Sequence, residues 1–178
     1  MEVDYYPYLT QGTWFTEQRW DRLIGKGFLE TVIEDQVFGK LSIINTHKVC
    51  TYKEDVDDYT DNYLVAQAAQ LLEKVRKMKE KNEPFILAGD LNFRKKSVLY
   101  PQFRELLYDF TEALQDFHLF KYPQIDYVFM SHEQKHFTEY VLLPQESKDE
   151  KYPSDHPGII VDIKPNNLMV FMMRQKEL

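Results

Sequence analysis

The sequence contains a single cysteine, Cys50, so no disulfide can form within the chain. Residues 1–8 are acidic and aromatic and lack the basic start and apolar core of a secretory signal peptide. No apolar run is long enough to span a bilayer. The formal net charge is -7, which argues against coating nucleic acid through bulk positive charge. These absences favour a cytoplasmic or membrane-associated protein over a secreted one, and they leave room for an enzyme that binds one phosphate locally.

The apolar pattern predicts a single α/β domain. With 178 residues, the chain is long enough for one substantial core but short for two. Apolar runs bounded by turn residues predict strands at 27–33, 40–46, 84–89, 125–131, 137–143 and 158–163. Residues 36–39 predict a hairpin between the first two strands. Strands interleaved with helices indicate α/β layering.

Two apolar stripes at helical spacing predict helices. The first helix follows the acidic loop 51–61, is capped by Thr60 or Asp61, and carries the stripe Leu64, Ala68, Leu71, Leu72, Val75 and Met78. The second helix is predicted over 101–110, with one face formed by Phe103, Leu106, Leu107 and Phe110. Residues 166–178 are expected to form either an extra strand or an appended helix.

Four polar clusters follow or begin apolar strands: Asn45-Thr46-His47, Gly89-Asp90-Leu91-Asn92, Ile125-Asp126-Tyr127 and Ser154-Asp155-His156. Catalytic groups in α/β sheets collect at strand ends, over a crevice. Each cluster alone has an ordinary structural explanation, such as turn chemistry at Asp90. Asp126 is less easily explained, because a carboxylate within an apolar strand needs a partner, for which a histidine is suited.

In this order the four clusters resemble those of the endonuclease/exonuclease/phosphatase superfamily, which includes pancreatic deoxyribonuclease, apurinic endonucleases, inositol polyphosphate phosphatases and neutral sphingomyelinases. The resemblance runs over residues 6–163. It implies a four-layer αββα sandwich of the deoxyribonuclease-like type, with the amino-terminal half missing. Residues 1–164 would be the carboxyl-terminal part of that domain, and 165–178 an extension. The lead-in Gly12-Thr13-Trp14-Phe15 and Lys26-Gly27-Phe28 looks like the neutral sphingomyelinase branch.

The resemblance also implies roles for particular residues. Asp90 would orient or deprotonate the attacking water, while His47 and Asn92 would hydrogen-bond phosphoryl oxygens. His156 would act as general base or transition-state stabiliser, with Asp126 setting its tautomer. Asp155 and Asp90 would hold Mg²⁺, or another divalent cation such as Mn²⁺, which favours oxygen ligands and activates water.

The sequence departs from the family pattern in three respects. The strand-end Asn and the Glu that is the main metal ligand, both in the first half of the family's domain, are not found before Tyr6. Lys48 stands where a Leu commonly follows the Thr-His pair, and we expect it at the rim of the site, assisting anion binding. Leu64 stands where an Arg is common, removing a structural or substrate contact.

Several functions remain open. The first hypothesis is a Mg²⁺-dependent phosphodiester hydrolase acting on a sphingomyelin-like phospholipid, and the alternative within the fold is a nuclease or inositol-phosphate phosphatase. The third is a truncated, non-catalytic remnant that serves as an interaction module. The basic run Arg94-Lys95-Lys96 would attract a phosphate or an anionic membrane surface. The exposed sheet faces would need the carboxyl-terminal segment, a second copy, or the missing half to cover them.

Overall fold

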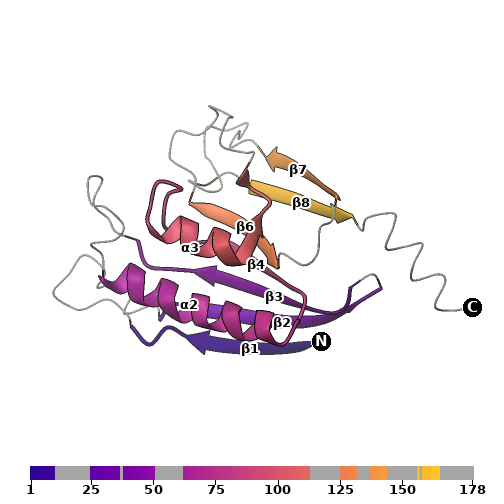
Figure 1. Cartoon of the computed structure of the whole chain (residues 1–178), viewed down its shortest axis with the longest axis horizontal. Helices are drawn as coiled ribbons and strands as arrows, with labels where there is room; N and C mark the ends of the chain where they lie inside the picture. Colours follow the sequence, from indigo (N-terminus) through magenta and orange to yellow (C-terminus); the bar gives the residue numbers. More distant parts are fainter. Residues whose placement is uncertain are drawn as a thin grey trace, which may run out of the picture.

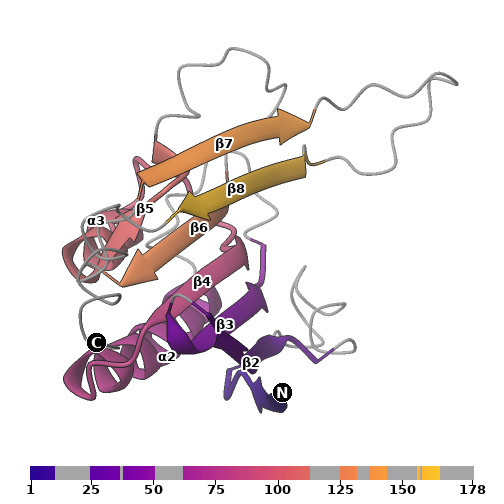
Figure 2. The same cartoon turned by 90° about the vertical axis from the view of Figure 1, so that its right-hand side faces the viewer.

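In the computed structural model the described residues are 1–10, 25–36, 38–50, 62–112, 125–131, 137–143, 156 and 158–164. Six strands form a mixed sheet in the order β1-β2-β3-β4-β6-β5 (Figure 1). These strands are β1 (Glu2–Pro7), β2 (Gly27–Asp35), β3 (Gly39–His47), β4 (Phe85–Asp90), β5 (Leu107–Asp109) and β6 (Asp126–Ser131). A second sheet pairs β7 (Phe137–Leu143) with β8 (Gly158–Lys164), and Figure 2 shows it beyond β6.

The order of the central strands determines which strand ends meet. Strands β2 and β3 form the predicted antiparallel hairpin, whereas β3 and β4 are parallel. A parallel pair needs a crossover, and helix α2 (Asn62–Glu80) provides it. Strand β6 runs antiparallel to β4. The ends of β3 and β4 therefore lie beside the start of β6.

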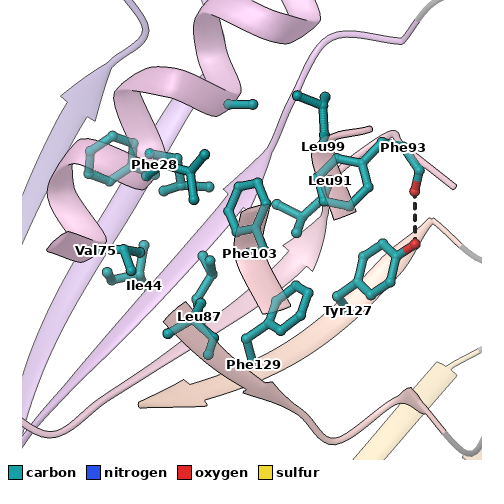
Figure 3. Close-up of a cluster of buried hydrophobic side chains, with 14 of the residues drawn as sticks. Phe28, Ile44, Val75, Leu87, Leu91, Phe93, Leu99, Phe103, Tyr127 and Phe129 are labelled. Atoms are coloured by element: carbon teal, nitrogen blue, oxygen red, sulfur yellow. Dashed lines mark hydrogen bonds between the residues drawn. The ribbon is translucent and has the colours of Figure 1, made fainter. Parts of the chain in front are cut away.

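Helices α2 and α3 (Leu99–Leu106) cover one face of the six-stranded sheet (Figure 1). The predicted apolar stripe of α2 is confirmed, because all six of its members are buried. They pack with aliphatic and aromatic side chains of the sheet and of α3, among them Phe28, Leu87 and Phe103 (Figure 3). Burial of this face is the main source of stability for both helices.

The opposite face of the sheet is more open at its β1 edge. Tyr6 stacks on Phe28 beneath α2, so alternation along the strands turns Val3, Tyr5 and Leu29 to the other side. These three apolar side chains are 50%, 56% and 39% exposed.

One expectation about local structure was wrong, and one strand was not expected. The helix predicted over 101–110 begins at Leu99 and ends at Leu106, and residues Leu107–Asp109 form β5 instead. Residues Leu107–Asp109 pair with β6, and the backbone hydrogen bonds of this pairing favour a strand although the apolar spacing of the segment suits a helix. Strand β1 was not predicted, because its pairing with β2 is not visible as an apolar run.

Several expectations lie outside the described residues. These are the cap residues Thr60 and Asp61, the lead-in Trp14-Phe15, and the segment 166–178. Among the described helices, none has the length and apolar character needed to cross a membrane.

Candidate active site

His47, Asp90 and Asp126 meet on three neighbouring strands. The strand register places His47 opposite Asp90, and Asp90 opposite Asp126. His47 Nε2 lies 3.4 Å from Asp90 Oδ2. The His47 side chain is 62% exposed, whereas that of Asp90 is 15% exposed. The imidazole of His47 is therefore accessible to an incoming molecule, while the neighbouring Asp90 carboxylate is mostly buried.

His156 lies against Asp126, although thirty residues separate them in sequence. The two side chains are joined by a hydrogen bond of 2.6 Å between His156 Nδ1 and Asp126 Oδ2. An ionised carboxylate can only accept, so Nδ1 carries the proton and Nε2 remains to exchange a proton with a ligand. Both side chains are partly exposed. This is the geometry of a histidine oriented by a carboxylate.

The electrostatic setting of Asp90 disfavours its charged form. Burial, and next the nearby Asp126 carboxylate, raise the pKa of Asp90 to about 6. The Asn92 backbone N–H and the positive charges of His156 and Lys26 act in the opposite direction. Asp90 is thus poised to exchange a proton near neutral pH, or to receive a cation in place of it.

The backbone around Asp90 brings Asn92 close to it. Asn92 adopts a left-handed conformation with φ 50°, and its backbone N–H donates to Asp90 Oδ1 at 2.8 Å. Its side-chain Nδ2 donates to the Lys48 carbonyl oxygen at 2.8 Å. Gly89 has φ 130°, and a Cβ there would lie 2.0 Å from the Thr46 carbonyl oxygen. Only glycine allows β4 to approach β3 so closely at this point.

Lys48 is not at the rim of the site, as its position after His47 had suggested, but fully buried. Its Nζ lies 4.7 Å from the centre of the Phe93 ring and 3.5 Å from the Leu64 carbonyl oxygen. Its own carbonyl oxygen also accepts a hydrogen bond from Lys26 Nζ at 2.8 Å. The cation packs inward because a polarisable ring and a helix carbonyl replace its hydration shell. The sequence pattern did not predict that Lys26 and Lys48 would be buried and would contact each other.

Lys95 and Lys96, in the basic run after Asn92, differ in their surroundings. Lys95 Nζ donates to the Glu112 carbonyl oxygen at 2.8 Å and lies 3.9 Å from Asp109 Oδ2. Lys96 is exposed. Attraction of an anion by this run therefore remains a prediction that concerns Lys96 more than Lys95.

Comparison with known families bears directly on this site. The model of the endonuclease/exonuclease/phosphatase family matches residues 7–156, most of the chain. The chain belongs to this family. Members of the endonuclease/exonuclease/phosphatase family are metal-dependent phosphoester hydrolases. A comparison with curated proteins returned no match.

Solved structures of this family share the fold. The human Nocturnin catalytic domain is 18% identical with a TM-score of 0.60, and the alignment covers 92% of this chain and 59% of that one. Truncated TDP2 from Caenorhabditis elegans is 16% identical with a TM-score of 0.64, covering 92% and 65%. A mannosyl-6-phosphatase from Bacteroides thetaiotaomicron is 21% identical with a TM-score of 0.58, covering 90% and 67%. The fold is thus the deoxyribonuclease-like α/β sandwich, and the chain spans 59% and 65% of the first two proteins.

The donor set fits a divalent cation in part. Ligand atoms of Asp90, Asp126 and His156 lie within 4.8 Å of one another. Both carboxylates also contact other site residues: Asp126 Oδ2 pairs with His156, and Asp90 accepts from the Asn92 backbone N–H and lies near His47. Repulsion from Asp126 would be relieved by a cation at Asp90. The expected second ligand, Asp155, lies outside the described residues.

Proposed function

We propose that the protein containing this chain is a Mg²⁺-dependent phosphodiester hydrolase whose catalytic groups are His47, Asp90, Asn92, Asp126 and His156. The single observation that supports this is the convergence of a carboxylate-oriented histidine and a proton-poised carboxylate at one edge of the sheet. Such a pair supplies the general acid–base chemistry that hydrolysis of a phosphodiester needs.

Each group has a distinct task in this proposal. Asp90 orients the attacking water, and the ionised carboxylate accepts its proton. Exposed His47 and the second Nδ2–H of Asn92 donate to phosphoryl oxygens, which gain charge in the transition state. His156 exchanges a proton at Nε2, because Asp126 holds the Nδ1–H. A bound Mg²⁺, held by Asp90 and Asp155, would supply charge neutralisation and lower the pKa of coordinated water.

For the substrate we propose a sphingomyelin-like phospholipid first. The support is the sequence lead-in that looks like the neutral sphingomyelinase branch, together with the net charge of -7, which disfavours a polyanion. The second candidate is a nucleic acid or a phosphorylated small molecule. Its support is the fold shared with TDP2 and with a mannosyl-6-phosphatase.

Activity assays on this chain with Mg²⁺ or Mn²⁺ test the proposal. The substrates are bis(p-nitrophenyl) phosphate, sphingomyelin in mixed micelles, DNA and inositol phosphates. Asp90→Ala should abolish metal-dependent hydrolysis, while Asp4→Ala, at an exposed carboxylate on β1, should leave it unchanged. Absence of hydrolysis and of Mg²⁺ binding by calorimetry would instead indicate a non-catalytic interaction module.

Val3, Tyr5 and Leu29 form an exposed apolar surface on one face of the sheet. We propose that a further sheet, from an amino-terminal half or a second copy of the chain, covers it in the active form. Exposed apolar side chains grouped on one sheet face are typical of a surface that is buried elsewhere. Analytical ultracentrifugation distinguishes the cases: dimerisation that Tyr5→Glu abolishes supports a second copy, and a stable monomer supports a separate half.

A further inference from the structure

The loop that follows β4 carries a residue in an uncommon conformation. Asn92 has φ 50° and is 6% exposed. Asparagine tolerates the left-handed region better than most residues, but a single residue held there in a buried loop depends on its surroundings. The neighbours of the loop are therefore part of what determines where Asn92 lies.

The first support comes from strand β6. The Tyr127 hydroxyl donates to the Phe93 carbonyl oxygen at 2.9 Å, the bond drawn in Figure 3. Its ring centre lies 5.2 Å from that of Phe93, and Tyr127 is 1% exposed. Tyr127 directly follows Asp126. The strand that presents Asp126 thus also holds the residue after Asn92.

The second support comes from the end of β3. Lys48 Nζ lies 4.7 Å from the centre of the Phe93 ring. The Lys48 carbonyl accepts from Asn92 Nδ2, and its backbone N–H donates to the Asp90 carbonyl oxygen at 3.0 Å. Phe93 is consequently held by contacts from β6 and from the residue that directly follows β3, and both strands carry residues of the proposed site.

We propose that Tyr127 and Lys48 are positioning residues that hold Phe93, and through it Asn92, in the geometry of the site. The Tyr127 hydroxyl donates a hydrogen bond to the carbonyl oxygen of the buried Phe93, and the Lys48 ammonium lies over the Phe93 ring. Without them the loop gains alternative conformations, and Asn92 leaves its place beside Asp90. The consequence for catalysis rests on the function proposed above, whereas the positioning itself does not.

Amide hydrogen exchange of the metal-free chain, followed by NMR, tests the positioning directly. Tyr127→Phe removes only the hydroxyl. The exchange rate of the Asn92 amide should rise about fivefold to tenfold relative to that of Leu87, in the middle of β4, as expected for a lost hydrogen bond. The matched control is Tyr100→Phe, which removes a hydroxyl that donates to Asp109 Oδ2 at 2.8 Å. That variant should leave the ratio of the two rates unchanged.

A second pair of variants covers the case in which Tyr127→Phe does not fold. Lys48→Met keeps the backbone contacts and removes the ammonium, and it should also accelerate exchange at Asn92. Lys74→Met is its control, because it also removes an ammonium that lies over an aromatic ring. That ring belongs to Tyr6, and its centre lies 4.8 Å from Lys74 Nζ. An unchanged ratio of Asn92 to Leu87 exchange in the folded variants would overturn the proposal.

Steady-state kinetics then connect the loop to catalysis. In an active preparation, Tyr127→Phe should lower kcat about tenfold or more with KM little changed, because a displaced transition-state donor affects the chemical step. Tyr100→Phe should leave kcat unchanged. Faster Asn92 exchange in a chain that hydrolyses nothing supports the positioning and contradicts only the proposed function. An unaltered kcat despite faster exchange would overturn the catalytic part of the inference.

Discussion

Asp126 accepts a hydrogen bond of 2.6 Å from Nδ1 of His156, which orients the imidazole from the first residue of β6. We expect Asp126→Asn to lower kcat by about 10²–10⁴-fold, because an amide can stabilise the wrong tautomer and cannot stabilise the imidazolium. Hydrolysis rates measured alongside circular dichroism check this. Asp4→Asn, on the exposed surface of β1, is the control. A rate within twofold of the unaltered chain would show that His156 needs no orienting carboxylate.

Asp90→Asn should stabilise the metal-free chain at neutral pH. The folded-state pKa of Asp90 is raised to about 6, so its contribution to stability is fully present below the unfolded value near 4 and is lost as pH rises through about 6. A neutral amide keeps that contribution, so the variant should gain about 1–3 kcal/mol above pH 7 and almost nothing at pH 4.

Thermal unfolding at several pH values measures this gain. Asp109→Asn is an informative comparison, because Asp109 accepts from the Tyr100 hydroxyl and from the backbone N–H and hydroxyl of Thr111. Replacing one of the two acceptor oxygens of Asp109 by an amide NH2 should destabilise the chain by about 1–3 kcal/mol. A pH-independent effect of Asp90→Asn would contradict the raised pKa.

Binding of Mg²⁺ should compete with a proton on Asp90. Below pH 6 the apparent affinity is expected to fall about tenfold for each pH unit, since the cation binds the ionised carboxylate. Calorimetry at pH 5, 6, 7 and 8 measures this, together with proton release in buffers of different ionisation enthalpy. Binding that is independent of pH over this range would place the metal away from Asp90.

Gly89→Ala should destabilise the chain by about 3 kcal/mol or more, or prevent folding. The added Cβ would lie 2.0 Å from the Thr46 carbonyl oxygen at a positive φ, so two strands must move apart. Gly39→Ala is the matched control, because Gly39 also has a positive φ of 67° but no atom lies within 4 Å of its added Cβ. That change should cost only about 1 kcal/mol. Equal losses would show that close approach at Gly89 adds nothing beyond its φ.

Much of the fold could be predicted from residue patterns, and the failures have identifiable causes. The stripe of α2 is visible because its burial depends on a helical period, and the β2–β3 hairpin because turn residues separate two apolar runs. The end of α3 could not be predicted from periodicity, since Leu107 suits either a helix face or a strand. Pairing with β6, a contact between segments distant in sequence, decides between them.

The candidate site divides in the same way. The sequence by itself determined which residues are candidates for the site, because His47, Asp90, Asn92, Asp126 and His156 stand in motifs at strand boundaries. Only the tertiary structure decided their neighbours. Burial raises the pKa of Asp90, and the strand register adds to this by placing Asp126 beside it; chain folding brings His156 to Asp126. It also buries Lys48 against Phe93, where a strand-end lysine had been expected at the rim. Burial and charge proximity are properties of distances between segments, and those distances exist only once the sheet has formed.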